Sequence, residues 1–236
     1  MFDTAFKDRI LFLTMARPPV NAINREWIDG FSGILDELGK RQDVAVVVVR
    51  SAHRVFSAGA DLKLMRECFA TESGPDDMLE TVRRMQRLND RIEALPQATI
   101  AEIGGSAFGG GLELALACDL RVAALDARLG LPEARLGLLP GAGGTQRLTR
   151  LCGAGQARRI ILAAAQLTGG EARDAGLVQW AVPGAELADF TAALAGRVAQ
   201  ASTMALAACK RCLGVADGSL APGMQDCCLR AQIAHR

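Results

Sequence analysis

Histidine is scarce in this sequence, which has only His53 and His235 among 236 residues. Neither stands in a sequence context typical of a catalytic triad. Ser57 also lacks the Gly-x-Ser-x-Gly context that exposes a nucleophilic serine at a strand-to-helix turn. The sequence therefore disfavours a hydrolase that works through Ser, His and Asp.

Strong net charge and long apolar runs are missing as well. The net charge is +1 at pH 7, so the totals carry no electrostatic footprint for nucleic acid or an anionic membrane. No apolar run approaches the roughly 18 residues that a membrane-spanning helix needs. Residues 1–9 are mixed polar and do not resemble a signal peptide. We therefore expect a cytoplasmic protein.

Phosphate-loop and zinc patterns are absent too. No run ends in Gly-Lys-Ser/Thr, as a phosphate-binding loop of nucleotide hydrolases would. Of 7 cysteines, Cys209 and Cys212 have the C-x-x-C spacing, but no second pair follows at zinc spacing and no histidine is close. We interpret the cysteines as structural thiols and expect no metal.

The apolar residues that are present predict an α/β fold. Half of the residues are hydrophobic, which suits one domain with a sizeable core. Residues 10–14 and 44–49 read as strands, and the second is a mostly β-branched run typical of a strand buried on both faces. Between them, residues 25–38 have apolar side chains at helical spacing. A strand, a helix and a buried strand indicate parallel crossover units.

The same pattern continues along the chain, and alanine-rich helices follow it. Further predicted helices cover 64–92 with a break at 73–75, 109–117, and 157–167 with Gly169 and Gly170 past its end. Further predicted strands cover 99–103 and 120–123. From about residue 183 the predicted helices are 187–199, 204–213 and 224–233. We therefore divide the chain into a catalytic core, 1–183, and a helical C-terminal region for subunit association, 184–236.

Two carboxylates stand beside glycine-rich or proline-bounded turns. Glu113 follows the glycine run 109–111, and Glu133 follows Pro132. Carboxylates close to exposed backbone N–H groups can supply an acid, a base and an oxyanion hole. Two simpler interpretations stay open on these residues alone. In the first, the glycines serve only to let a helix pack tightly on a strand. In the second, Glu113 is there only because the positive end of a helix stabilises a carboxylate.

Several motifs together resemble the crotonase family, also called the enoyl-CoA hydratase/isomerase superfamily. They are PVNA at 19–22, FSAGADLK at 56–63, AEIGGSAFGGGLELA at 101–115, CDLRVA at 118–123, PGAGGTQRL at 140–148, LTG at 167–169 and ARDAGLV at 172–178. The resemblance runs from about residue 10 to 215. It implies a crotonase-like spiral of repeated ββα units with a helical C-terminal region.

The resemblance also implies a site. The thioester oxygen of an acyl-CoA would accept hydrogen bonds from the backbone N–H groups of Ala60 and Gly110. Glu113 would deprotonate the water that adds to C3, and Glu133 would protonate C2. The residues expected to line the substrate and CoA channel are Ala22, Ala58, Ala60, Asp61, Leu62, Lys63, Gly110 and Gly141. No separate cofactor is expected, since coenzyme A is part of the substrate, and the family implies a homotrimer or a dimer of trimers.

The expected activity is enoyl-CoA hydration in fatty-acid or related acyl-CoA degradation. The presence of both glutamates favours a hydratase, because many relatives with other activities lack one of them. Three alternatives stay open: a double-bond isomerase, a hydratase for a branched acidic substrate such as methylglutaconyl-CoA, and a non-catalytic acyl-CoA-binding protein.

Overall fold

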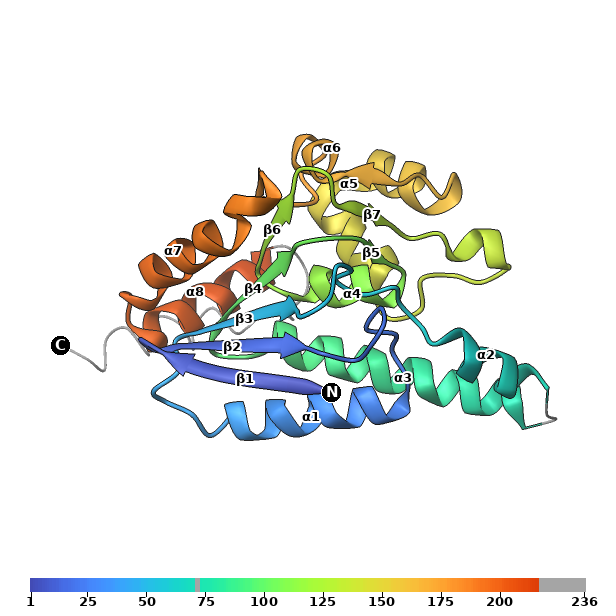
Figure 1. The fold of residues 1–236 in the computed structure, drawn as a ribbon, viewed down its shortest axis with the longest axis horizontal. Helices are drawn as coiled ribbons and strands as arrows, with labels where there is room; N and C mark the ends of the chain where they lie inside the picture. The colour runs from blue at the N-terminus through green and yellow to red at the C-terminus, as the bar shows by residue number, and fades with distance from the viewer. Residues whose placement is uncertain (71–72, 217–236) are drawn as a thin grey trace.

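A six-stranded sheet forms the centre of the fold in the computed structural model, which describes residues 1–70 and 73–216. The strand order is β1-β2-β3-β4-β6-β9 (Figure 1). The strands are β1 (Phe2–Lys7), β2 (Ile10–Met15), β3 (Val46–Ser51), β4 (Ala98–Ile103), β6 (Leu120–Ala124) and β9 (Trp180–Val182). β1 pairs with β2 antiparallel, and every other pairing in this sheet is parallel. The predicted parallel crossover units are therefore confirmed.

A second, smaller sheet lies beside the first and consists of β5 (Ala107–Phe108), β7 (Arg128–Gly130) and β8 (Leu167–Thr168). β5 pairs with β7 in parallel, and β7 pairs with β8 antiparallel. β4 leads into β5 and β6 leads into β7 (Figure 1), so each ββ unit crosses from the large sheet to the small one. Glu113 lies in the first turn of the helix that follows β5, and Glu133 begins the 3-10 turn that follows β7.

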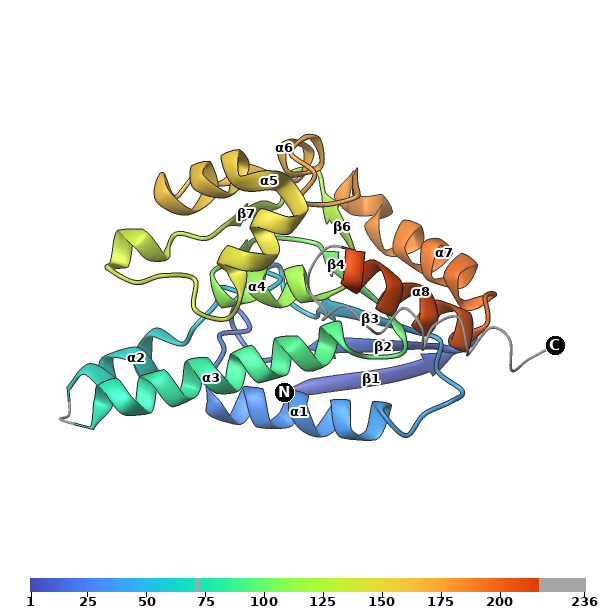
Figure 2. The same ribbon diagram turned by 180° about the vertical axis from the view of Figure 1, so that it is seen from behind.

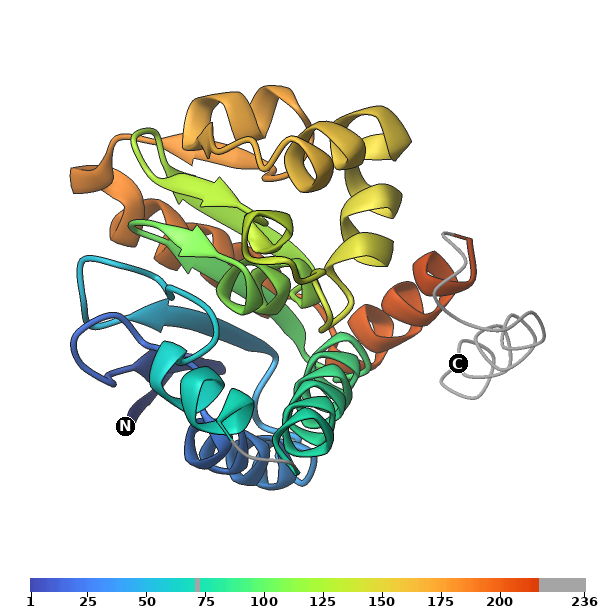
Figure 3. The ribbon, with the colours of Figure 1, turned by 90° about the vertical axis from the view of Figure 1, so that its right-hand side faces the viewer.

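Helices pack on both sides of the large sheet. They are α1 (Arg25–Leu38), α2 (Leu62–Phe69), α3 (Gly74–Glu93), α4 (Gly110–Ala117), α5 (Gly144–Leu162), α6 (Gly169–Asp174), α7 (Leu187–Ala199) and α8 (Thr203–Ala216), with 3-10 turns η1 (Glu133–Leu136) and η2 (Gly184–Glu186). α1 and α3 run side by side (Figures 2 and 3). α7 packs against four strands of the large sheet, β2, β3, β4 and β6. None of the described helices is long and apolar enough to cross a membrane.

Helix α1 has the bounds that the sequence predicts. Its buried stripe includes Trp27, Phe31 and Leu35, and the Asn24 side chain accepts a hydrogen bond from the Trp27 N–H as the N-cap. Both rings lie against Phe2 of β1, with centroid distances of 5.2 and 5.5 Å. The strong apolar period and the capping residue explain why this prediction succeeds.

The helix predicted over 157–167 is wrong at both ends. α5 begins at Gly144, is interrupted at Gly153, where φ is 75°, and ends at Leu162. Leu167 belongs to β8. Gly169 and Gly170 do not follow a helix but begin α6, because Thr168 and Glu171 form a capping box at its start.

The C-terminal helices agree with the sequence as far as the structure describes them. α7 begins at Leu187 and ends at Ala199 as expected, and α8 contains the predicted helix 204–213. The helix predicted over 224–233 lies outside the described residues. The division of the chain at residue 183 stays a prediction.

Candidate active site

The two glutamates and both expected oxyanion-hole residues line one pocket of about 850 Å³, measured to include its open mouth. Glu113 and Gly110 come from the first turn of α4, Glu133 begins η1, and Ala60 precedes Asp61, the N-cap of α2. The fold therefore brings these four residues to one place although the first and last are 73 positions apart in the sequence (133 − 60).

Ala60 and Gly110 both line the pocket, and the local backbone pairing leaves their N–H groups unused. Ala60 forms a parallel bridge with Ile23 in which the Gly59 carbonyl accepts from the Ile23 N–H and the Asp61 N–H donates to the Ile23 carbonyl. The Ala60 N–H consequently points away from Ile23. Gly110 is the first residue of α4, so its N–H has no partner within the helix. An oxyanion hole requires two such donors, and their assignment to this role stays a prediction.

Gly59 makes this close approach of two backbones possible. Its φ is 88°, a conformation that residues with a side chain rarely adopt. A Cβ at this position would lie 2.7 Å from the Phe108 carbonyl oxygen and 3.1 Å from the Gly110 nitrogen. The glycine in the motif at 56–63 is therefore explained by the contact between the two turns.

Glu113 is buried, with 3% of its surface exposed, and is held by backbone hydrogen bonds. Its Oε1 accepts from the N–H groups of Ala142 and Gly144, each at 2.8 Å. A Cβ on Gly144 would lie 2.8 Å from the same oxygen. The second glycine run thus surrounds one carboxylate oxygen of Glu113.

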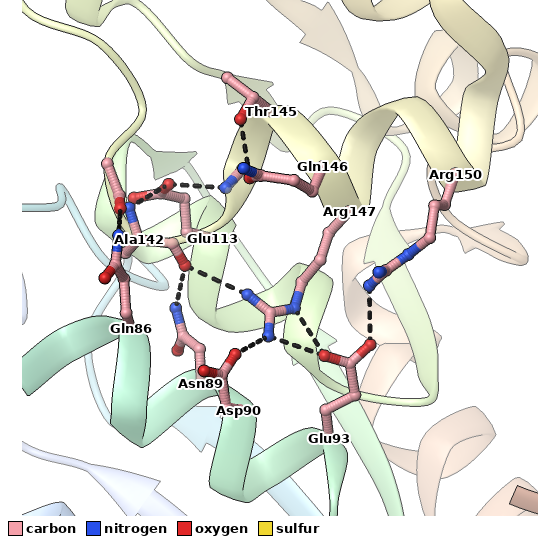
Figure 4. Close-up of polar contacts among 12 residues, drawn as sticks. Gln86, Asn89, Asp90, Glu93, Glu113, Ala142, Thr145, Gln146, Arg147 and Arg150 are labelled. Atoms are coloured by element: carbon pink, nitrogen blue, oxygen red, sulfur yellow. Dashed lines mark hydrogen bonds and ion pairs between the residues drawn. The ribbon is translucent and has the colours of Figure 1, made fainter. Parts of the chain in front are cut away.

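Side chains of α3 and α5 hold the loop that carries these donors (Figure 4). Gln86 Nε2 donates to the Gly141 carbonyl at 2.6 Å, and Asn89 Nδ2 donates to the Ala142 carbonyl at 3.0 Å. Arg147 also donates to the Ala142 carbonyl and forms ion pairs with Asp90 and Glu93. The loop is therefore fixed from the side opposite Glu113.

Glu133 lies beside Gly109, the N-cap residue of α4. The position of a Cβ on Gly109 would be 3.0 Å from Glu133 Oε1. Glu133 Oε2 is buried and has no hydrogen-bond partner among the described residues. A carboxyl oxygen without a donor favours the neutral acid, whereas two N–H donors favour the carboxylate.

Burial changes the ionisation of both glutamates. It raises the pKa of Glu113 to about 7, an effect to which the negative charge of Glu133 adds and which the Gly144 and Ala142 N–H groups and the Arg147 cation oppose. Burial also raises the pKa of Glu133. A proton on this pair near neutral pH is what a site that both accepts and donates a proton needs.

The residues expected along the CoA channel fall in two places. Ala58, Ala60, Leu62, Gly110 and Gly141 line the pocket. Asp61 and Lys63 line a neighbouring depression together with Arg17 and Arg25. Asp61 pairs with Arg17 at 2.7 Å and caps α2, and the Ala22 carbonyl accepts from the same arginine. Contact of these residues with CoA stays a prediction.

The sequence alone does not indicate that Ala142 and Gly144 donate hydrogen bonds to Glu113, nor which side chains hold these donors in place. The signal was present in part, since the run 141–144 contains three glycines that no helix or strand pattern explains. Glu113 lies 29 and 31 residues before Ala142 and Gly144 in the sequence. Only the packing of α4 against α5 brings it into contact with them.

The remaining walls of the pocket are apolar. They include Met65 of α2, Met78, Val82 and Met85 of α3, and Leu136, Leu138 and Leu139 in and after η1. Glu113 and Glu133 are the two charged residues that line it within the described part of the chain. The pocket therefore combines an apolar wall with a polar, acidic floor.

Comparison with known proteins gives concordant matches. The family model described as enoyl-CoA hydratase/isomerase matches residues 5–218. A probable enoyl-CoA hydratase of Bacillus subtilis (strain 168) is 41% identical over 199 residues, which cover 84% of this chain and 76% of that protein. An enoyl-CoA isomerase/hydratase of Mycosarcoma maydis is 39% identical over 181 residues, which cover 76% of this chain and 64% of that protein. The crystal structure of an enoyl-CoA hydratase from Bacillus anthracis matches with a TM-score of 0.90 and 30% identity, covering 100% of this chain and 92% of that one.

Proposed function

Because the chain belongs to the enoyl-CoA hydratase/isomerase family and has its crotonase fold, we propose that it adds water across the 2,3 double bond of a 2-enoyl-CoA thioester. The observation that carries this proposal is the pair Glu113 and Glu133 in one pocket with the two backbone donors of Ala60 and Gly110. A hydration needs one group to activate water and another to protonate carbon, and each carboxyl supplies one of these functions.

The proposed reaction proceeds through charge on the thioester oxygen. Glu113 removes a proton from a water molecule as the water oxygen bonds to C3. The electrons of the double bond move toward the thioester carbonyl, whose oxygen accepts hydrogen bonds from the N–H groups of Ala60 and Gly110. Glu133 then gives its proton to C2. Glu113 ends protonated and Glu133 ionised, so a proton must return to Glu133 before the next turnover.

The assignment of base and acid follows from the hydrogen bonds of each carboxyl. Glu113 has two N–H donors on Oε1, which stabilise its ionised form and leave Oε2 for the water. Glu133 has a buried oxygen with no donor, which favours its protonated form.

We predict that the protein removes the ultraviolet absorbance of the conjugated thioester when it is mixed with crotonyl-CoA. The product expected is 3-hydroxybutyryl-CoA, identified by mass as substrate plus one water. An isomerase without hydratase activity would leave crotonyl-CoA unchanged and would convert a 3-enoyl-CoA into the conjugated isomer. A non-catalytic acyl-CoA-binding protein would change neither substrate, and either of these results would refute the proposal.

We further propose that the acyl group is uncharged and apolar, which disfavours the acidic substrates of a methylglutaconyl-CoA-type hydratase. The acyl wall, defined here as Met65, Met78, Val82, Met85 and Leu139, offers no cation to a carboxylate, and the floor carries two acidic groups. Unbranched thioethers adapt to different neighbours, so three methionines suit a range of chain lengths.

For a six-carbon 2-enoyl-CoA and its analogue with a terminal carboxylate, kcat/KM should favour the uncharged substrate by at least about 100-fold, since burying an unpaired charge costs several kcal/mol. Steady-state kinetics with both thioesters tests this expectation. Equal values would show that the acyl chain does not enter the apolar part of the pocket.

The pathway, the location, the cofactor requirement and the oligomeric state are proposals as well. We propose that the reaction serves acyl-CoA degradation in the cytoplasm, without a separate cofactor, in a homotrimer or a dimer of trimers. The resemblance to the family supports the acyl-CoA substrate and the oligomer.

A further inference from the structure

One peptide group joins Gln86 to Glu113. The carbonyl of Gly141 accepts a hydrogen bond from Gln86 Nε2 at 2.6 Å, and the N–H of the same peptide, on Ala142, donates to Glu113 Oε1 at 2.8 Å. Gln86 lies on α3 with its side chain exposed, and it is outside the set of described residues that line the pocket. Its amide therefore reaches the candidate base through the backbone and not through the substrate.

A hydrogen bond to the carbonyl of a peptide makes its N–H a stronger donor, because the two ends of the group polarise together. The other donor to Glu113, the Gly144 N–H, belongs to the peptide of the Gly143 carbonyl, and that carbonyl accepts the Arg147 N–H within α5. Asn89 and Arg147 act on the Ala142 carbonyl, one peptide further along. Gln86 is thus the side chain that acts on the peptide whose N–H contacts Glu113.

On the basis of the proposed hydration, we propose that Gln86 is a positioning residue for Glu113. Its amide polarises the peptide between Gly141 and Ala142, strengthens the hydrogen bond to Glu113 Oε1 and keeps the carboxylate ionised and in place. Its side chain is not among the described residues that line the pocket.

Other charged groups that face Glu113 also change its pKa. Glu133 faces it from η1 and raises its pKa when it is itself ionised, and Arg147 of α5 lowers it. Arg147 in turn pairs with Asp90 and Glu93 of α3. Gln86 is uncharged, so replacing it with another neutral residue changes the hydrogen bond and leaves these charges as they are.

The experiment measures the ionisation of Glu113 with and without the Gln86 donor. Carboxyl carbon NMR of glutamate-labelled protein follows the titration of Glu113, and Glu113→Gln identifies its signal. Gln86→Met has similar length and no donor. Because the carboxylate loses part of a hydrogen bond, its pKa should rise by about 0.3–0.7 pH unit in this variant. Gln86→Lys restores an N–H donor and should return the titration to the wild-type pH or below it.

Kinetics gives an independent reading of the same change. Glu113 must be ionised to act as a base and its pKa is raised to about 7, so kcat/KM of the wild type should fall as the pH drops through this region. In Gln86→Met this decline should move to higher pH by the same amount as the titration. At pH 7 kcat should fall about threefold to tenfold with KM unchanged, since part of the loss comes from a less fixed base.

Arg87→Gln is the matched control, because Arg87 is the exposed neighbour on α3, and its ion pair is with Glu80. It changes a charge on the same helix without touching Gly141, and it should leave the titration where it is. An unchanged Glu113 titration in Gln86→Met, or a shift of equal size in Arg87→Gln, overturns the role of Gln86. Wild-type protein that does not hydrate crotonyl-CoA would count against the proposed function instead, because the titration is read without substrate.

Discussion

Replacing Glu113 by glutamine is expected to lower kcat for crotonyl-CoA hydration by about 10²–10⁴-fold, the usual effect of losing a general base. A glutamine oxygen still accepts the N–H bonds of Ala142 and Gly144, so the loop should stay in place. What the amide cannot do is take a proton from water. Glu133→Gln should cause a loss of similar size, because its amide has no acidic proton for C2.

The double variant separates this mechanism from a general disturbance of the pocket. Two groups that act in one reaction lose their effect together, so the combined loss should be far smaller than the product of the single losses. Circular dichroism and thermal unfolding should match the wild type in all three variants. Near-normal turnover in either single variant would remove that glutamate from the mechanism.

The second large effect is expected for Ala60→Pro, which removes one N–H of the candidate oxyanion hole. The bridge to Ile23 uses the Gly59 carbonyl and the Asp61 N–H, so proline at 60 breaks neither of its hydrogen bonds. Loss of one such donor should reduce kcat by about 10²–10³-fold. Affinity for a saturated acyl-CoA should fall less, because its ground-state carbonyl carries less negative charge than the developing enolate.

Ala60→Ser is the control for this change, since it alters the side chain and keeps the N–H. It should retain most of the wild-type turnover. Both variants should match the wild type in circular dichroism and in size by light scattering. If a well-folded Ala60→Pro protein hydrates crotonyl-CoA at the normal rate, residue 60 does not supply the oxyanion hole.

The predictable part of the fold is the part with strong local patterns. The periodicity of α1 and the β-branched run of β3 define those elements because each buries one full face or both. The sequence does not predict β1, because most of its side chains are exposed and no alternation of buried and exposed positions marks it as a strand. The strands of the small sheet have only 2 or 3 residues, too few for any period.

The site shows the same division between local and distant information. The motifs that carry Ala60, Gly110, Glu113 and Glu133 were recognisable, and the structure gathers these residues in one pocket. The hydrogen bonds that hold Glu113 were not, because they join α4 to a loop that follows η1, and side chains of α3 in turn hold that loop. Such contacts depend on how three elements pack, and no spacing in the sequence encodes them.

Helix α3 faces the pocket and the loop at once. Met78, Val82 and Met85 belong to the acyl wall, while Gln86 and Asn89, within the next turn, hold the backbone that positions Glu113. A mutation that tilts this helix to admit a different acyl chain would also displace the catalytic loop. A new substrate range is therefore expected to evolve through single substitutions in the acyl wall. The position of the α3 axis is expected to stay the same during these changes.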